Sequence, residues 1–334
     1  MIRTNQSNST VARGTENNNT IFCRDVVDGL RADMKHLQSK YFYDAMGDRL
    51  FQRIMNSPEY YLFNCELEIF STRTADLASL LLQPGGSFDL IELGPGDCTK
   101  SGYLLQHLVK ANADFTYVPI DISTSIIQYL ETQLPQRIPG IKISSLEGEY
   151  SEMLAKAATI SRNRKVILFL GSNLGNMTPE QALAFSRNIR SHLQKGDLAL
   201  IGLDLKKDPN TVLAAYNDKE GITRQFNLNL LKRINRELKA NFDISKFEHY
   251  PTYDPATGSC KSYLVSQEEQ SVCFIAGNNL EVINFKKGEP IYMELSQKYT
   301  TDEIGRMAQQ AGFSTAGFFY DSKGWFVDAC WKAI

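Results

Sequence analysis

The sequence predicts an α/β protein whose doubly wound sheet ends in an antiparallel hairpin, with a second, mixed α/β subdomain. Three observations support this fold class. Short apolar runs alternate with helical patterns between residues 88 and 203, which is typical of a parallel sheet with helices on both faces. After residue 204 the rhythm changes to two helical stretches followed by several β-like runs. Near the end of the chain, two apolar runs flank Asp321-Ser-Lys-Gly324, a turn sequence typical of a hairpin.

The elements of the predicted sheet follow in chain order. We expect strands at 88–93, 117–121, 141–146, 165–170 and 198–203. Helices are expected after the first strand through residue 108, at about 123–130 and at 178–194. The last of these has the clearest start, because Thr178 can cap it, Pro179 fits its first turn and Gln181 completes a capping box.

The second subdomain is predicted from the remaining elements. Helices are expected at 211–217 and 223–240, turn-rich sequence at 254–258, and β-like runs at 262–265, 271–275, 280–285 and 291–299. A helix at 301–311 and the runs 316–320 and 325–331 close the chain. We therefore expect 65–206 and 298–334 to form the sheet domain, and 21–64 with 207–297 to form the subdomain. Residues 1–20, rich in Asn, Ser and Thr, are predicted to be a disordered tail.

The composition argues against several classes of protein. The 334 residues include 36 Lys and Arg against 38 Asp and Glu, with no segment basic enough to neutralise a row of phosphates, so nucleic acid is not an expected partner. No apolar run approaches the roughly 20 residues that span a bilayer, and the N-terminus lacks the apolar core of a secretory signal. The 6 cysteines and 4 histidines show no metal-ligand spacing. We expect a cytoplasmic monomer without a metal site.

A loop with two glycines, Glu92-Leu-Gly94-Pro-Gly96, follows the first strand. Glycines at this place let the backbone approach a ligand in the crevice beyond the strand ends. A dinucleotide site would need a third glycine where this sequence has Thr99. One alternative is a cofactor without phosphates, for which Glu92 suits a cationic group. Another is a turn that simply needs two glycines.

Asp121 ends the second strand, 27 positions after Gly94. An acid at this place can accept both hydroxyls of a ribose, although alone it is equally consistent with a helix cap or a solvated side chain. The loop and the acid together indicate an adenosine that carries a small charged group. S-adenosylmethionine (SAM) fits that description, and the antiparallel end of the sheet agrees with it.

The stretch 291–299 carries a polar face if it is a strand, because alternate residues then point the same way. Glu294 and Ser296 would be adjacent on that face and able to hold a planar donor-rich group such as an imidazole. An ordinary half-exposed strand shows the same alternation. Tyrosines at 41–43 and 60–61 can surround an amine that gains positive charge, or can belong to the core.

Ten motifs occur in order along residues 40–299: YFYDAMGDRLF (41–51), SPEYY (57–61), ELGPGDCTK (92–100), YVPIDIS (117–123), LFLGSNLGNMTP (168–179), DLKKDP (204–209), AAYNDKEGIT (214–223), FNLNLLKRINREL (226–238), FEH (247–249) and ELSQKY (294–299). Together they resemble the histidine-specific SAM-dependent methyltransferases, the EgtD-like enzymes of ergothioneine biosynthesis. The resemblance implies a class I SAM-methyltransferase (Rossmann-like) sheet with SAM as cofactor and 207–297 as part of a substrate-recognition subdomain.

The resemblance also assigns roles by position. Cofactor contacts are implied at Gly94, Lys100 and Asp121, with Glu149 and Tyr150 at the adenine. For the substrate, Asn176 and Tyr216 would hold the α-carboxylate, and Glu294 and Ser296 the imidazole, with Tyr60 nearby. Tyr43 and Gly171 would line the region of the reacting amine.

The implied activity is three successive methylations of the L-histidine α-amine, which give Nα,Nα,Nα-trimethylhistidine (hercynine), the first step of ergothioneine-type biosynthesis. Tyr43 would orient the amine rather than act as a strong base, because an unperturbed tyrosine titrates near pH 10. Glu294 would fix the imidazole through a charge-assisted hydrogen bond.

The sequence departs from the family pattern at three places. Pro95 stands where a small polar residue is common, and residues 61–63 read Tyr-Leu-Phe instead of Tyr-Pro-Thr. Ser262 stands where a methionine lies against the imidazole, which would widen the ring pocket. The alternatives are therefore an aromatic or tryptophan-derived amino acid as substrate, a non-catalytic SAM- or histidine-binding regulator, and, weakest because of Thr99, a nicotinamide oxidoreductase.

Overall fold

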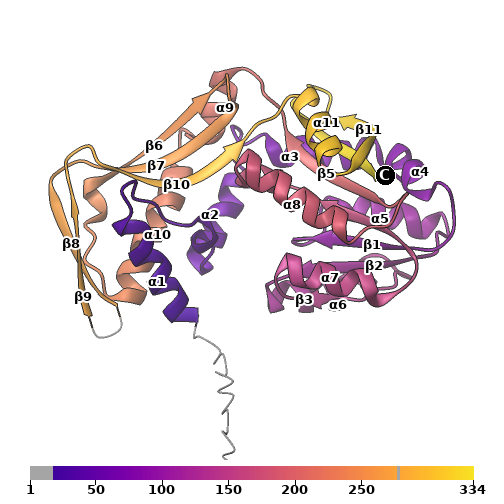
Figure 1. Ribbon diagram of the computed structural model, residues 1–334, viewed down its shortest axis with the longest axis horizontal. Helices are drawn as coiled ribbons and strands as arrows, with labels where there is room; N and C mark the ends of the chain where they lie inside the picture. Colours follow the sequence, from indigo (N-terminus) through magenta and orange to yellow (C-terminus); the bar gives the residue numbers. More distant parts are fainter. Residues whose placement is uncertain (1–17, 277–278) are drawn as a thin grey trace, which may run out of the picture. The chain divides into compact units, whose positions relative to one another are not determined.

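The computed structural model describes residues 18–276 and 279–334 (Figure 1). The chain divides into two compact units. The large unit comprises Leu50–Thr223, Pro251–Ser262 and Glu294–Ile334; the small unit comprises the chain up to Arg49, Arg224–Tyr250 and Tyr263–Met293. Helix α1 (Asn18–Arg31) begins inside the stretch predicted as a tail, and residues 1–17 lie outside the described residues.

A seven-stranded sheet forms the centre of the large unit, in the order β11-β12-β5-β4-β1-β2-β3. Its strands are β1 (Phe88–Leu93), β2 (Phe115–Asp121), β3 (Leu146–Glu147), β4 (Arg164–Phe169), β5 (Leu198–Asp204), β11 (Phe313–Tyr320) and β12 (Phe326–Ala333). The first five strands pair in parallel, and β12 is antiparallel to both β5 and β11. The predicted fold class is confirmed.

The third strand is shorter than the 141–146 that the sequence predicts. Ile143 forms a single bridge to Tyr117, and regular pairing with β2 resumes only at Leu146. The next residue of β2 that would donate to this edge is Pro119, which has no N–H. The prediction is therefore wrong in extent, because the proline interrupts the ladder.

Helices cover both faces of the sheet and bury its alternating side chains (Figure 1). Helices α3 (Leu62–Thr72), α4 (Thr74–Leu82), α5 (Ser101–Lys110) and α6 (Thr124–Arg137) pack on one face, against residues such as Leu90 and Leu200. Helices α7 (Tyr150–Ile160), α8 (Pro179–Ser191) and α11 (Thr301–Gln310) pack on the other, against Ile91 and Ile201. The capping box predicted at Thr178 and Gln181 is present.

The C-terminal hairpin is also as predicted. Tyr320 pairs with Val327, and Asp321 closes the turn by accepting the backbone N–H groups of Trp325 and Phe326, each at 2.7 Å. One carboxylate oxygen thus satisfies two donors that the turn would otherwise leave unpaired.

The remaining elements are further helices and two additional antiparallel sheets. They include η1 (Ser39–Phe42), α2 (Ala45–Met55), η2 (Asn173–Asn176), α9 (Pro209–Ala215), α10 (Ile222–Leu238) and η3 (Ile244–Lys246). Strands β10 (Pro290–Gln297), β7 (Ser259–Ser266) and β6 (Phe247–Asp254) form one sheet, and β8 (Gln270–Ala276) pairs with β9 (Asn279–Phe285). In the small unit, the rings of Phe242, Phe247 and Phe285 pack together.

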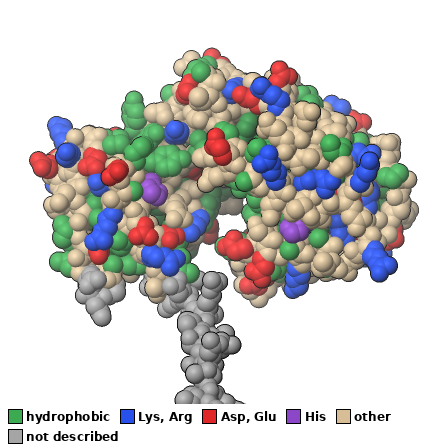
Figure 2. All heavy atoms as spheres, viewed as in Figure 1, with side chains coloured by type: hydrophobic (Ala, Val, Ile, Leu, Met, Phe, Trp, Pro, Cys, Tyr) green, Lys and Arg blue, Asp and Glu red, His purple; other side chains and the backbone are tan. Residues whose placement is uncertain are grey.

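The charges on the surface and the character of the helices can be described for the part of the chain that the structure covers. Figure 2 shows Lys and Arg side chains interspersed with acidic and uncharged ones on one face. Among the described residues, no helix has the length and apolar character needed to cross a bilayer, and no group of His, Cys, Asp and Glu has the arrangement of a metal site.

Candidate active site

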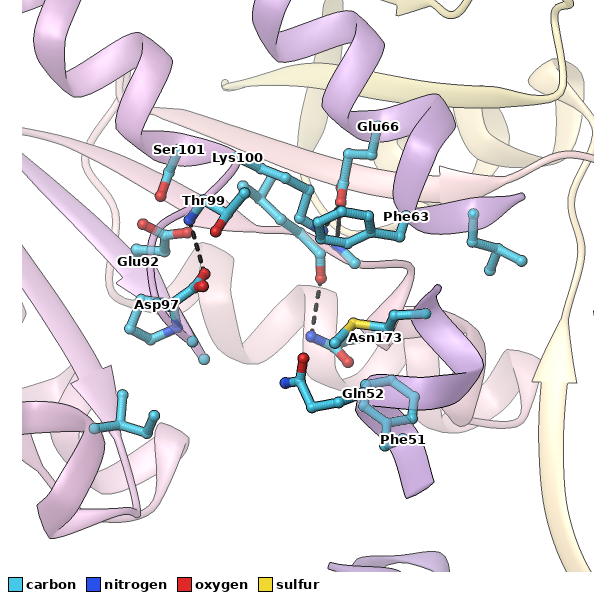
Figure 3. A pocket seen from close by; sticks show the side chains of 18 of the residues that line it. Phe51, Gln52, Phe63, Glu66, Glu92, Asp97, Thr99, Lys100, Ser101 and Asn173 are labelled. Carbon is cyan, nitrogen blue, oxygen red and sulfur yellow. Dashed lines mark hydrogen bonds and ion pairs between the residues drawn. The ribbon is translucent and has the colours of Figure 1, made fainter. Parts of the chain in front are cut away.

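A cavity of about 360 Å³ opens in the large unit at the carboxyl ends of β1 and β4 (Figure 3). Three segments supply most of its wall: the glycine loop after β1, the start of α3, and the turn after β4. Four of the residues to which the resemblance assigns a role line it, namely Tyr60, Gly94, Lys100 and Gly171. Ligands of open α/β sheets bind at this edge, so the cavity lies where the fold predicts a cofactor site.

The glycine loop can approach a ligand because of its backbone conformation. Gly94 and Gly96 have φ of 67° and 55°, in the left-handed region that favours glycine. A Cβ at Gly94 would collide with the Tyr150 hydroxyl, whereas a Cβ at Gly96 would meet nothing within 4 Å. Tyr150 therefore lies directly against the first glycine, and its role at the adenine stays a prediction.

Glu92, at the end of β1, gives the cavity a buried carboxyl group. It accepts a hydrogen bond of 2.6 Å from the Tyr117 hydroxyl, and burial raises its pKa to about 7. A bound cation would favour the ionised form and lower this pKa. The site therefore suits a positively charged ligand group, as the sequence indicated.

The acid of the second strand lies beside the glycine loop. The Gly94 N–H donates to the carbonyl of Ile120 at 2.9 Å, which puts the neighbouring Asp121 at the same edge of the sheet. Asp121 accepts the N–H of Ser123 at 2.9 Å, and burial raises its pKa. Glu149 is the residue just before α7, which follows β3. The structure thus gathers the predicted cofactor residues at the ends of adjacent strands.

Lys100 and Gly171 meet at a buried carboxylate that the sequence did not reveal. Glu66 of α3 accepts the Gly171 N–H at 2.8 Å and 3.0 Å through its two oxygens and forms an ion pair with Lys100 (Figure 3). Gly171 has φ of 76°, so the turn after β4 also depends on a glycine. One carboxylate therefore holds two walls of the cavity.

Asp328 of β12 lies beside Glu66 and shares its buried surroundings. Burial, and then the charge of Glu66, raises the pKa of Asp328 well above its usual range. Two adjacent buried carboxyl groups cannot both ionise cheaply, so a proton stays between them while Glu66 remains paired with Lys100.

This arrangement predicts different changes in the free energy of unfolding for two conservative variants. Glu66→Gln should lower the free energy of unfolding by roughly 2–3 kcal/mol, somewhat less than a fully buried pair because the Lys100 side chain keeps 19% exposure. Asp328→Asn should change it by less than about 1 kcal/mol at or below about pH 4, where the carboxyl group is largely protonated in the folded and unfolded states alike. The raised pKa means that wild-type stability is lost as pH rises through it, so Asp328→Asn should flatten that fall. Urea unfolding at several pH values tests this; equal losses for the two variants would contradict it.

A second polar cluster in the large unit contains the residues expected at the substrate. The Tyr216 hydroxyl and Ser296 Oγ lie 2.6 Å apart, and the buried Lys298 donates to them at 2.7 Å and 2.8 Å. The rings of Tyr60 and Tyr216 meet edge to face at 6.4 Å. Glu294, two residues before Ser296 on β10, is partly buried, and burial raises its pKa to about 7.

The residues that line the cavity or form the polar cluster within the large unit do not include Asn176 or Tyr43. Asn176 is exposed at the end of η2, and Asn173 of the same short helix lines the cavity in its place. Tyr43 belongs to the small unit, is 46% exposed and packs its ring against Phe226. The roles of Asn176 and Tyr43 stay predictions.

The charged residues that sequence reasoning missed are Glu66, Asp328 and Asp204. Glu66 could have been noticed because Leu62, Ile69 and Phe70 lie three or four positions away, on the same face of α3, and an acid on an apolar face is buried only with a partner. Asp328 and Asp204 carry no such signal, because each lies in a strand whose partners are distant in sequence.

A seven-stranded sheet with an antiparallel hairpin, and a glycine loop beside a strand-ending acid, define a class I methyltransferase. A family model described as "Histidine-specific methyltransferase, SAM-dependent" matches residues 22–333, and the chain belongs to this family. SAM is therefore its methyl donor. The glycine loop at Gly94 and the buried carboxyl group of Glu92 fit a cofactor that carries a positive charge.

Named relatives agree with the family. The chain is 34% identical over 303 residues to histidine N-alpha-methyltransferase of Mycolicibacterium smegmatis, covering 91% of this chain and 92% of that protein. It is 30% identical over 283 residues to ergothioneine biosynthesis protein 1 of Schizosaccharomyces pombe, covering 83% of this chain and 36% of that protein. It is 25% identical over 313 residues to L-tryptophan methyltransferase trpM of Psilocybe serbica, covering 86% and 85%.

Proposed function

We propose that the enzyme methylates the α-amine of L-histidine three times in succession to give Nα,Nα,Nα-trimethylhistidine, a product suited to ergothioneine-type synthesis. The observation that carries this proposal is that Glu294 lies two residues before Ser296 on β10, where alternate residues share a face, and that the Ser296 hydroxyl pairs with that of Tyr216. Burial raises the pKa of Glu294 to about 7, close to the roughly 6.5 of an imidazole, so the two groups can share a proton.

The cofactor residues proposed from the sequence offer a complementary partner for each part of SAM. SAM, when bound, supplies an electrophilic methyl group on a positively charged sulfur. Gly94 leaves room for it, Asp121 suits the ribose, and Glu149 with Tyr150 suits the adenine. Lys100 supplies a cation for the carboxylate of the methionine portion, and Glu66 holds that cation in place.

The substrate residues have to orient a neutral amine. Tyr216, with Asn176, would hold the α-carboxylate, while Tyr60, Glu294 and Ser296 fix the ring. Tyr43 and Gly171 would border the amine, whose lone pair becomes available once a proton passes to water. Alignment then supplies most of the acceleration, because the donor is intrinsically reactive.

The test is mass spectrometry of the purified protein incubated with SAM and single amino acids. Histidine should gain one, two and then three methyl groups, while tryptophan, tyrosine and phenylalanine remain essentially unmodified. Trimethylation of tryptophan with histidine unchanged would overturn the proposal. Binding of SAM without methylation of any amino acid would favour the regulator alternative instead.

A tryptophan-type substrate is the second candidate, favoured by Ser262, which is 3% exposed and smaller than the family's methionine. An indole, however, offers one N–H and no acceptor. It could satisfy either Glu294 or Ser296 but not both, and the partner left unpaired would weaken binding. Histidine satisfies both groups. The cytoplasmic location and monomeric state stay predictions.

A further inference from the structure

Lys298 is fully buried and each of its three N–H donors has an acceptor. It donates to Tyr216 Oη at 2.7 Å and to Ser296 Oγ at 2.8 Å, and its ion pair with Asp204 Oδ2 is 2.7 Å long. An ammonium group accepts no hydrogen bonds. Neither hydroxyl can therefore direct its proton toward Lys298.

The two hydroxyl groups carry two protons, and one of them lies in the hydrogen bond between the two oxygens. The 2.6 Å separation of Tyr216 Oη and Ser296 Oγ requires one proton between the oxygens. A single proton is left to point outward. If Tyr216 gives it to a ligand, Ser296 has donated its own proton to Tyr216 and faces the ligand as an acceptor.

An α-carboxylate can only accept hydrogen bonds, so at Tyr216 it takes the outward proton. Ser296 then needs a donor, which a ring N–H supplies. The second ring nitrogen faces Glu294, and a proton must lie between them. Bound ring and Glu294 together thus hold one proton more than a neutral imidazole beside an ionised glutamate.

We propose that Lys298 is a positioning residue that limits Tyr216 and Ser296 to one outward proton, so that the substrate ring is bound with a proton at each nitrogen, one of them shared with Glu294. This inference rests on the proposed function, since it takes histidine as the ligand. It adds a property beyond the assignment of residues to the α-carboxylate and the ring. The carboxylate subsite at Tyr216 and the ring subsite at Ser296 are coupled, because the two hydroxyl groups share a hydrogen bond.

The groups around the hydroxyl pair affect how the number of protons taken up on ligand binding is interpreted near neutral pH. Burial raises the pKa values of Tyr60, Tyr61, Tyr216, Tyr253 and Cys260, so all stay protonated. The charged groups that face the cluster are Asp204, Lys207 and Lys298, which are tied to one another by ion pairs. Glu294 and the ligand ring are left as the groups that change protonation.

Calorimetric titration of the wild-type enzyme, saturated with S-adenosylhomocysteine, provides the first test. The ligand is Nα,Nα,Nα-trimethylhistidine, whose fixed charge removes the amine from the proton count. In two buffers of different ionisation heat at pH 8, binding should take up about one proton, and affinity should fall up to 10-fold per pH unit above pH 8. Binding with no uptake would overturn this inference alone. Failure to bind, together with no methylation of histidine, would overturn the proposed function.

Two matched variants test the role of Lys298. Lys298→Met should raise KM for histidine at least 10-fold, with a smaller change in kcat and no change in KM for SAM. Lys207→Met removes the other ammonium group from Asp204 without touching Tyr216 or Ser296, so its histidine KM should stay near wild type. Equal KM changes in the two variants would mean that Lys298 is merely structural.

Discussion

Replacing Glu294 with alanine should lower kcat/KM for histidine by on the order of 10³-fold and leave SAM affinity unchanged. The variant removes the proposed charged partner of one ring nitrogen, and a site built around a polar group discriminates strongly when one partner is missing. Glu294 is partly buried and its pKa is raised to about 7, so water replaces it poorly. Initial rates with histidine, and calorimetric binding of S-adenosylhomocysteine, measure the two effects.

Tryptophan and a surface acid serve as controls for this prediction. The weak activity expected with tryptophan should not fall in Glu294→Ala, because an indole has one N–H and gains little from the carboxylate. Glu303→Ala removes a partly exposed acid of the same unit that pairs with Lys206, and histidine turnover should be unaffected. If Glu294→Ala kept wild-type kcat/KM for histidine, the assignment of the ring site would be wrong.

Gly94→Ala should abolish measurable SAM binding, a loss of at least 10²-fold in affinity. The added Cβ would collide with the Tyr150 hydroxyl, so either the loop or Tyr150 must move. The left-handed φ of 67° adds roughly 1–2 kcal/mol of backbone strain. Calorimetry with SAM measures the affinity, and urea unfolding measures the strain.

Gly96→Ala is the matched control in the same loop. Its φ of 55° imposes comparable strain, but its Cβ would meet nothing within 4 Å. Both variants should therefore lose similar stability, while Gly96→Ala keeps most of its SAM affinity. Equal losses of affinity would show that loop strain, and not the contact with Tyr150, sets cofactor binding.

Much of the sheet could be predicted because apolar runs record burial directly. Residues 165–170 lack alternation, and β4 is indeed covered on both faces. The extent of β3 could not be predicted from its own residues, because Pro119 on the neighbouring strand decides it. Strand β6 was overlooked although Phe247 and His249 are buried while Glu248 and Tyr250 are exposed, an alternation hidden by its polar composition.

Some contacts of the candidate site could likewise be predicted from the sequence, and others could not. Gly94 with Asp121, and Glu294 with Ser296, could be paired from sequence because strand order and strand period bring them together. Lys298 falls within the stretch 291–299 that is predicted as a strand, yet its three acceptors come from three separate segments. Contacts such as Glu66 with Gly171 depend on how a helix packs on the sheet, which periodicity does not encode.

A competition assay tests the central claim that Glu294 and Ser296 select an imidazole. Equal concentrations of histidine and tryptophan are incubated with enzyme and limiting SAM, and both sets of methylated products are quantified by mass spectrometry. The product ratio equals the ratio of the two kcat/KM values. We expect histidine products to exceed tryptophan products by at least 10²-fold, ending in the trimethylated form. Comparable amounts, or an excess of methylated tryptophan, would contradict the claim.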